Sequence, residues 1–176
     1  MEMAFLGENG SSSVEEKVFE LKKVVWRLAM IAAVLIQSTV PVEASDPVTS
    51  QLVDREGIPM GLVYLEPDDA GVRVHVSVSG LRPNTNYEFH FHEYAACDAP
   101  EFQSAGAYWN PDHELSSVAG ELPNIRTDND GRYSDSIVAE HASLIEGSIN
   151  NPVLPAGSSL VLERSGARIA CGTVEG

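Results

Sequence analysis

The sequence predicts an all-β domain, an antiparallel sandwich or flattened barrel with long loops. From Ser45 onward, short segments of alternating apolar and polar residues are separated by Gly, Pro, Asn and Asp. This is the pattern of half-buried strands joined by turns. No convincing stretch with a helical apolar period occurs in the same region. The segments add up to eight candidate strands, which suits a sheet folded onto itself.

The first three strands follow from local pattern alone. Thr49–Asp54 and Met60–Glu66 flank the turn-forming stretch Arg55–Pro59, which indicates a hairpin. Gly71–Ser79 alternates strictly, with four valines on one face and polar residues on the other. His75 belongs to the polar set, so we expect it on the solvent face rather than in a metal site.

The fourth predicted strand, Tyr87–Glu93, carries aromatic residues on one face and Glu88, His90 and His92 on the other. Side chains two apart on a strand lie ~7 Å apart along the same face. Two imidazoles in that position can converge on one metal ion with bonds of ~2 Å. The alternative is a polar strand face that carries two histidines without binding a metal.

The second half of the domain begins with a long irregular stretch, Glu93–Pro123, rich in Ala, Asp, Pro and Ser. Loops of that length inside a compact domain are usually functional or tethered. Beyond it the alternating pattern predicts the four remaining strands, at Glu121–Thr127, Arg132–Ala139, Ser158–Arg164 and Arg168–Val174.

Two cysteines occur in the chain, Cys97 and Cys171. Both lie in the part of the chain expected to be exported, where a pair of cysteines forms a disulfide by default. Closing a loop of about 75 residues would stabilise the fold by up to ~4.5 kcal/mol on the chain-entropy description. The alternative is a pair of free, buried thiols.

An export signal is predicted at residues 22–44. Lys22, Lys23 and Arg27 form a basic flank before the apolar run Leu28–Ile36, and small or apolar residues precede Ser45, where cleavage is expected. The apolar run is too short to span a membrane. The predicted organisation is therefore an N-terminal extension with a signal peptide over residues 1–44 and one domain over residues 45–176, located in the periplasm or outside the cell.

The chain is strongly acidic, with 26 acidic residues against 11 basic ones and a net charge of −15. This charge argues against a nucleic acid or an anionic membrane as partner, because both bind basic patches. It would also repel an anionic substrate unless a local cation offset it.

Four segments together resemble the copper/zinc superoxide dismutase family over roughly residues 48–176. They are Phe89-His90-Phe91-His92-Glu93, Ser104-Ala105-Gly106-Ala107-Tyr108-Trp109-Asn110-Pro111, Gly120-Glu121-Leu122-Pro123-Asn124-Ile125 and Gly166-Ala167-Arg168-Ile169-Ala170-Cys171-Gly172. The resemblance implies an eight-stranded antiparallel Greek-key β-barrel. It also implies copper ligands at His90 and His92, a disulfide between Cys97 and Cys171, and an arginine at Arg168 that draws in the superoxide anion.

The chain departs from the family at the other copper ligands. Tyr108 stands where the family carries the histidine that bridges copper and zinc, and a neutral phenol cannot bridge two metals as an imidazolate does, although a phenolate could bind one cupric ion. The strand Leu160–Arg164 lacks the remaining copper histidine. Two of the four copper ligands are therefore retained.

The zinc ligands are depleted further. The resemblance places the zinc-binding carboxylate at Glu121, and one zinc histidine position falls at Val118. His113 could fill the other histidine role, could turn toward the copper side, or could be an exposed loop residue. Copper is therefore the expected metal, and the zinc set is too incomplete to predict zinc as a cofactor.

The leading functional expectation is an exported superoxide dismutase-like protein with a reduced copper site and weak or absent dismutation. One alternative is an active copper-only dismutase with substitute ligands, and another is a metal-free structural or copper-handling module. The expected small-molecule partner is the superoxide anion if activity remains. A homodimer is left open as the assembly.

Overall fold

A computed structural model describes residues 47–113, 118–153 and 156–176. The predicted extension and signal peptide lie outside these residues. Within the described ranges, no helix is long and apolar enough to cross a membrane.

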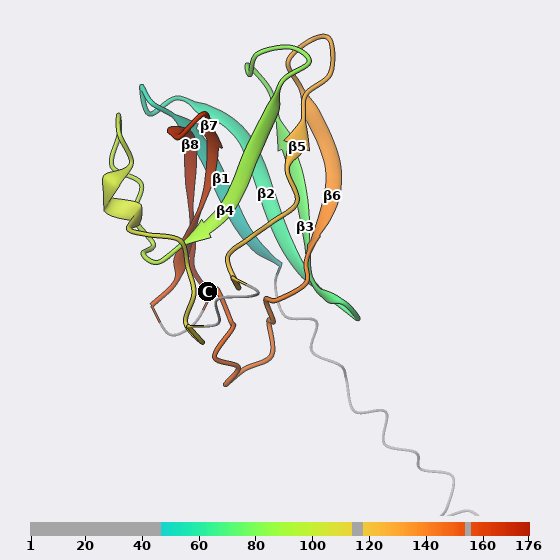
Figure 1. Ribbon diagram of the computed structural model, residues 1–176, viewed down its shortest axis with the longest axis vertical. Helices are drawn as coiled ribbons and strands as arrows, with labels where there is room; N and C mark the ends of the chain where they lie inside the picture. The colour runs from blue at the N-terminus through green and yellow to red at the C-terminus, as the bar shows by residue number, and fades with distance from the viewer. Residues whose placement is uncertain (1–46, 114–117, 154–155) are drawn as a thin grey trace, which may run out of the picture. The chain divides into compact units, whose positions relative to one another are not determined.

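The described residues form eight antiparallel strands and one short 3₁₀ turn (Figure 1). This confirms the all-β prediction, and each predicted strand has an observed counterpart. The strands are β1 (Val48–Asp54), β2 (Pro59–Asp68), β3 (Gly71–Val78), β4 (Asn86–His92), β5 (Ile125–Arg126), β6 (Tyr133–Ala139), β7 (Ser158–Arg164) and β8 (Ala167–Val174), with the turn η1 at Gln103–Ala105 between β4 and β5.

Strand β5 is much shorter than the predicted Glu121–Thr127. Only Ile125 and Arg126 pair with β4, while Glu121 forms an isolated bridge with His90. The physical reason is Pro123, whose ring nitrogen has no hydrogen to donate to a ladder between these two points.

The strands follow one another around the sheet in the order β5-β4-β7-β8-β1-β2-β3-β6. The connections from β3 to β4 and from β6 to β7 join strands that are not neighbours, as a Greek key requires. The end strands β5 and β6 are joined by the short segment 127–132, so the sheet curls into a nearly closed barrel (Figure 1).

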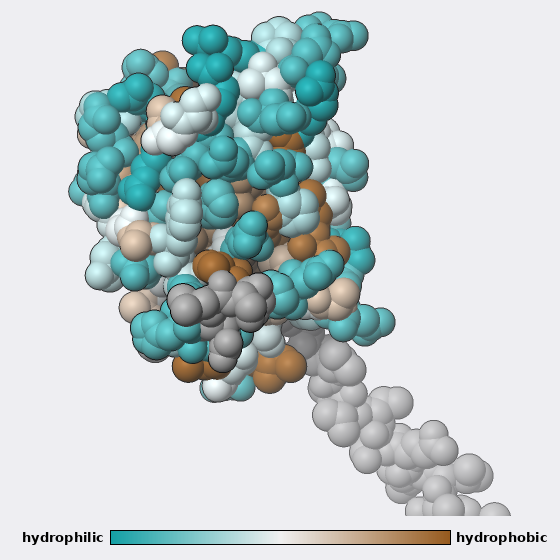
Figure 2. Space-filling view, viewed as in Figure 1, coloured by the Kyte–Doolittle hydropathy of each residue, from teal (hydrophilic) through white to brown (hydrophobic). Residues whose placement is uncertain are grey.

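The core lies inside this barrel. The four alternating valines of β3 are buried, and so are the aromatic residues of β4, Tyr87, Phe89 and Phe91. Full burial of each such side chain contributes about 1.5–3 kcal/mol relative to exposure. The visible outer face is mostly hydrophilic, in keeping with the acidic composition (Figure 2). The alternation read from the sequence thus fixes which face of β4 is turned outward.

His75 is on the outer face, as expected, but it is only partly exposed. Its ring stacks on Tyr64 with centroids 4.1 Å apart. Its two nitrogens contact Glu66 Oε1 and Ser136 Oγ, each at 2.7 Å. Tyr64 and Ser136 lie directly opposite His75 on β2 and β6, so the cross-strand neighbours provide these contacts.

The predicted disulfide between Cys97 and Cys171 is confirmed, with α-carbons 5.6 Å apart. It ties the long loop that follows β4 to strand β8. Beside it, η1 packs onto the outer face of the sheet in a small second core made of Phe102, Ala105, Val161 and Cys171, with Val53 and Cys97 packed against it. The loop therefore covers the polar side of β4 instead of leaving it to solvent.

Candidate metal centre

The candidate site lies where β4, β7 and β8 meet the covering loop. His90 and His92 share the outward face of β4, as their spacing predicts. Isolated bridges join His92 to Tyr108 and His90 to Glu121, so two parts of the loop run along the end of β4. The strand supplies two imidazoles, and the loop places other side chains over them.

His92 is completely buried, at 0 % exposure. Its Nδ1–H donates to the carbonyl of Gly106 over 3.1 Å, since a carbonyl can only accept. The other ring nitrogen, Nε2, is buried and has no hydrogen-bond partner. Burial is the largest cause that lowers the pKa of His92, with a smaller contribution from the charge of Arg168. The ring is therefore held neutral with its Nε2 lone pair turned into the site.

Gly106 has a positive φ of 81° at the point where its carbonyl meets His92. A β-carbon built at this position would lie 2.6 Å from Tyr94 Cδ2. Glycine is the residue that adopts this backbone conformation without strain. The loop conformation that orients His92 therefore depends on glycine at this position.

His90 is half-buried, and its Nδ1 is buried without a hydrogen-bond partner. Its ring stacks on the ring of Tyr108, with centroids 4.4 Å apart. Burial lowers the pKa of His90, and the carboxylates of Glu163, Glu88 and Glu121 oppose that shift. His90 thus presents a second neutral nitrogen in a locally negative field, which favours a cation.

Tyr108 lies against both histidines, and its ring meets the His92 ring edge-on, with the two ring centroids 5.1 Å apart. Its hydroxyl donates to Glu163 Oε2 over 3.1 Å. Burial and the nearby charge of Glu163 raise the pKa of Tyr108. The phenol is therefore kept protonated as a hydrogen-bond donor, which disfavours the phenolate that a direct metal bond would need.

Glu163 is the site residue that the sequence reasoning missed. It lies at the end of β7, is 5 % exposed, and places Oε1 3.4 Å from His92 Nε2. The resemblance predicts a histidine on this strand, and the carboxylate of Glu163 was not predicted as a site residue. The available signal was an acidic residue at the end of an otherwise apolar strand, where the resemblance places the remaining copper histidine.

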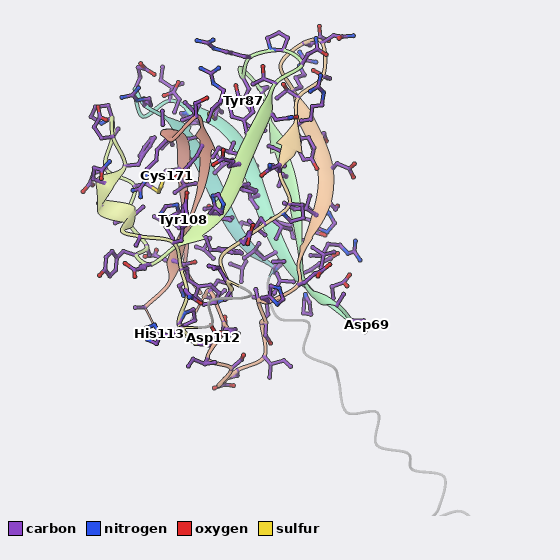
Figure 3. The ribbon with its side chains drawn as sticks, in the orientation of Figure 1. Asp69, Tyr87, Tyr108, Asp112, His113 and Cys171 are labelled. Atoms are coloured by element: carbon purple, nitrogen blue, oxygen red, sulfur yellow. A yellow bond between two sulfur atoms is a disulfide. The ribbon has the colours of Figure 1, made fainter. Side chains whose placement is uncertain are left out.

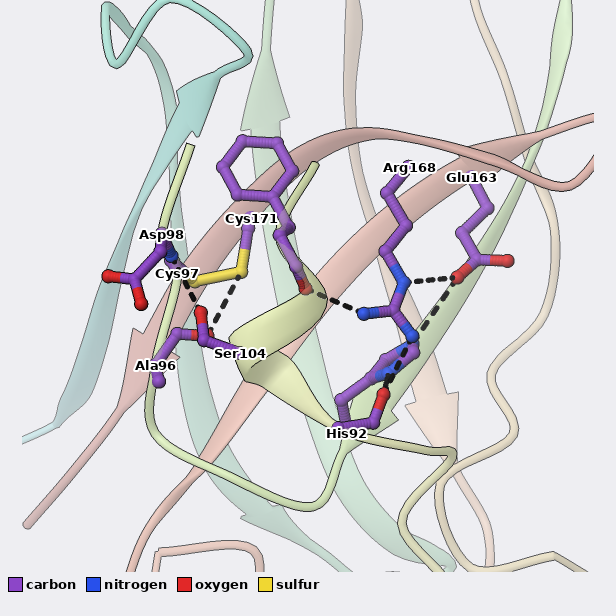
Figure 4. The surroundings of a disulfide bond; sticks show 10 residues. His92, Ala96, Cys97, Asp98, Ser104, Glu163, Arg168 and Cys171 are labelled. Atoms are coloured by element: carbon purple, nitrogen blue, oxygen red, sulfur yellow. Dashed lines mark hydrogen bonds and ion pairs between the residues drawn. A yellow bond between two sulfur atoms is a disulfide. The ribbon is translucent and has the colours of Figure 1, made fainter. Parts of the chain in front are cut away.

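Arg168 lies on β8 with its side chain 17 % exposed. Its two terminal nitrogens donate to the carbonyls of Phe102 and Gly106, each at 2.6 Å, and its Nε lies 3.4 Å from Glu163 Oε1. Figure 4 shows the guanidinium between Glu163 and His92, close to the disulfide. The guanidinium thus binds the covering loop to strand β8 through these two hydrogen bonds. The role of Arg168 in steering anions stays a prediction.

The residues proposed for zinc are not brought together. His113 is exposed, with a positive φ of 57°, and Figure 3 shows it away from Tyr108, beside Asp112. Glu121 is exposed although its backbone bridges to His90. Across residues 47–113, 118–153 and 156–176, no three His, Cys, Asp or Glu side chains are grouped closely enough to hold a metal ion. The described residues therefore do not bring His113 and Glu121 together as a zinc-binding pair.

The copper pair fits better. The two buried nitrogens without partners, His90 Nδ1 and His92 Nε2, come from adjacent positions on one strand face. Burying a polar atom without a partner costs roughly 1–3 kcal/mol, so a ligand at both nitrogens would relieve that cost. Imidazole suits copper among the biological metals. The arrangement offers two donors for copper and shields one of them fully from water.

The lowered pKa of His90 and His92 predicts how the metal-free protein responds to pH. A histidine with a lower pKa in the folded state binds protons more readily when unfolded, so stability is lost as the pH falls below the unfolded value of about 6.5. We expect the urea midpoint of metal-free protein to drop between about pH 7.5 and about pH 5.5. The variant His90→Gln/His92→Gln should show a smaller drop, and an equal drop in both proteins would contradict the assignment.

Comparison with known proteins gives a consistent result. Residues 60–174 match the family model for copper/zinc superoxide dismutase (SODC). The chain is 34 % identical over 146 residues to the superoxide dismutase-like protein YojM of Bacillus subtilis (strain 168), covering 72 % of this chain and 74 % of that protein. It is 31 % identical over 145 residues to superoxide dismutase [Cu-Zn] 1 of Aquifex aeolicus (strain VF5), covering 72 % of this chain and 86 % of that protein.

A solved structure shares the same percentage of identical residues with this chain. It is a double mutant of a superoxide dismutase-like protein from Bacillus subtilis, in which a tyrosine and a proline are replaced by histidine. The TM-score is 0.69 at 34 % identity, over 75 % of this chain and 100 % of the other.

Proposed function

The chain belongs to the copper/zinc superoxide dismutase family, and on this premise we propose that it is an exported, copper-binding member with little or no dismutase activity. The observation that carries the proposal is the pair of buried nitrogens, His90 Nδ1 and His92 Nε2, that lack partners. They belong to the two histidines expected from the sequence to bind copper, and each is buried without a hydrogen-bond partner.

Export is supported by two features. The basic flank and apolar run of residues 22–44 have the form of a signal peptide. The disulfide between Cys97 and Cys171 is of the kind that persists in oxidising compartments. The mature protein would then begin at Ser45, in the periplasm or outside the cell.

Weak activity is supported by the surroundings of the two histidines. Dismutation requires a copper ion, which would supply one-electron redox cycling, together with attraction of the superoxide anion and a source of protons. Glu163 lies 3.4 Å from the Arg168 guanidinium and offsets the charge that would attract the anion. Tyr108 replaces the bridging histidine, and its raised pKa makes the phenol a poor proton donor near neutral pH.

The experiment compares copper content and superoxide turnover in protein purified from the export compartment. Wild-type protein is expected to carry close to one copper ion per chain and to show turnover far below that of a family member with all four ligands. His90→Ala/His92→Ala should lose the copper. The matched control is His113→Ala/His141→Ala, which removes two exposed histidines and should keep it.

Two results would overturn the proposal. Copper-free wild-type protein would favour the metal-free structural module. Turnover comparable to that of an intact family member would instead favour an active copper-only dismutase. N-terminal sequencing of the mature protein tests export separately, with Ser45 as the expected first residue.

A further inference from the structure

Glu163 is a buried carboxylate in which only one of the two oxygens, Oε2, accepts a hydrogen bond of ordinary length. One oxygen, Oε2, accepts a hydrogen bond from the Tyr108 hydroxyl at 3.1 Å. The other, Oε1, lies 3.4 Å from Arg168 Nε and also 3.4 Å from His92 Nε2. A charge-assisted hydrogen bond to a carboxylate is usually about 2.7–2.9 Å long. Oε1 is therefore near two nitrogens without a normal hydrogen bond to either.

The contact between Glu163 Oε1 and His92 Nε2 brings two hydrogen-bond acceptors together without a proton between them. The Gly106 carbonyl accepts from His92 Nδ1, so the proton of the ring is on Nδ1. Nε2 has no hydrogen-bond partner in the described structure. Its lone pair therefore faces the lone pairs of a carboxylate oxygen inside a buried site. Such a pair repels unless a cation lies between the two atoms.

The simplest structural explanation is that Glu163 is there only for Arg168. Arg168, however, already donates both terminal nitrogens to the carbonyls of Phe102 and Gly106 at 2.6 Å. Those two bonds are short and hold the guanidinium on the loop, whereas the contact from Nε to Glu163 is long. Arg168 compensates the charge of Glu163 without saturating Oε1, which leaves that oxygen available to another partner.

We propose that Glu163 Oε1 is the third protein donor to the copper ion held by His90 and His92. The inference rests on the proposed function. Nitrogen and oxygen donors together suit the tetragonal geometry of cupric copper. In the described part of the chain these three side chains are not grouped closely enough to hold a metal ion, so binding requires the Glu163 carboxylate to shift Oε1 toward the ion while it stays beside Arg168.

This donor set has a consequence for the redox chemistry. A carboxylate is a hard ligand, and it stabilises the cupric ion more than the cuprous ion, which softer ligands prefer. The oxidised state would be held more tightly than in a site built of imidazoles alone. Glu163 thus provides a reason for slow redox cycling that is independent of the loss of ligands.

The test measures Cu(II) binding by competition with a chelator, together with the electron paramagnetic resonance spectrum of the bound ion. Glu163→Gln is expected to weaken Cu(II) binding at least as much as loss of an outer-shell partner, about 10- to 100-fold, and to change the copper hyperfine splitting. Glu163→His should restore tight binding, with an added nitrogen signature in the spectrum.

The matched control is Glu88→Gln. Glu88 lies directly opposite Glu163 in the register of β4 and β7, is exposed, and also raises the pKa of His90 by its charge. Its removal tests the general field without removing a donor, and it should weaken binding by less than about fivefold. Thermal unfolding of the metal-free variants shows whether each one is folded.

The outcomes separate this inference from the proposed function. If wild-type protein binds no copper, the proposed function fails and this inference falls with it. If wild-type protein binds copper while a folded Glu163→Gln variant keeps both affinity and spectrum, the third-donor assignment is wrong and the proposed function stands. Equal losses in Glu163→Gln and Glu88→Gln would assign the effect to the electrostatic field and overturn the donor role. If Glu163→Gln is unfolded without metal, the test uses Glu163→His instead. A copper electron paramagnetic resonance spectrum of Glu163→His identical to that of wild-type protein would then contradict the proposal, because a histidine that binds the ion adds a nitrogen signature.

Discussion

Removing the disulfide between Cys97 and Cys171 is expected to lower the free energy of unfolding by about 4.5 kcal/mol, the value for closing a loop of about 75 residues. The two cysteines are 74 positions apart, so the bridge restricts a large part of the unfolded chain. Urea unfolding of Cys97→Ala/Cys171→Ala at neutral pH measures the loss. A total stability of about 5–15 kcal/mol is usual for a domain, so this change is a large fraction of it.

The control for this prediction is wild-type protein treated with a thiol reductant. It breaks the same bridge without changing a side chain, and its unfolding midpoint should fall to a similar value. Cys171 is completely buried beside Phe102 and Val161, so the alanine variant also removes some packing. A loss below about 1 kcal/mol in both samples would show that the disulfide does not act by restricting the unfolded chain.

Replacing Tyr108 by histidine is expected to tighten copper binding by more than the about 10- to 100-fold attributed to an outer-shell partner. The Tyr108 ring already stacks on His90 and contacts the edge of His92. An imidazole in its place would add a donor at the position where the family carries its bridging histidine. Competition titration with Cu(II) measures the affinity, and a superoxide assay measures any gain in turnover.

Tyr108→Phe separates the added donor from the lost hydroxyl. It keeps the stacked ring but removes the hydrogen bond to Glu163 Oε2. We expect it to change Cu(II) affinity much less than Tyr108→His does, because it adds no ligand. If both variants bind copper with the same affinity, the aromatic position is not a place from which a ligand can reach the ion.

The outward face of β4 shows how far the sequence could predict the site. The period-two pattern placed His90 and His92 together, because side-chain direction in a strand depends only on the alternation. It did not predict that His92 is fully buried. That burial comes from the covering loop, whose path is set by the distant disulfide and by the two carbonyls that Arg168 holds.

The pairing of Arg168 with Glu163 could not be read from alternation, because it depends on an irregularity in β8. The pairing of β7 with β8 shifts register after Leu162, so that Ala170 lies opposite Leu162 but Arg168 lies opposite Glu163. A single extra residue, Ile169, reverses which side chains share a face. The sequence therefore predicted Arg168 as the cation that draws in an anion, and it did not predict that a buried carboxylate, Glu163, lies beside the guanidinium.

The place of β8 in the barrel has a consequence for the order of folding. β8 lies between β7 and β1, and Val53 pairs with Cys171, more than about a hundred residues later in the chain. Contacts so distant in sequence form slowly, because the entropy of loop closure is lost before the pairing is gained. Arg168 and Cys171 both belong to this strand. The candidate metal centre is thus completed only when the barrel closes, and a nascent chain that lacks β8 offers copper no finished site.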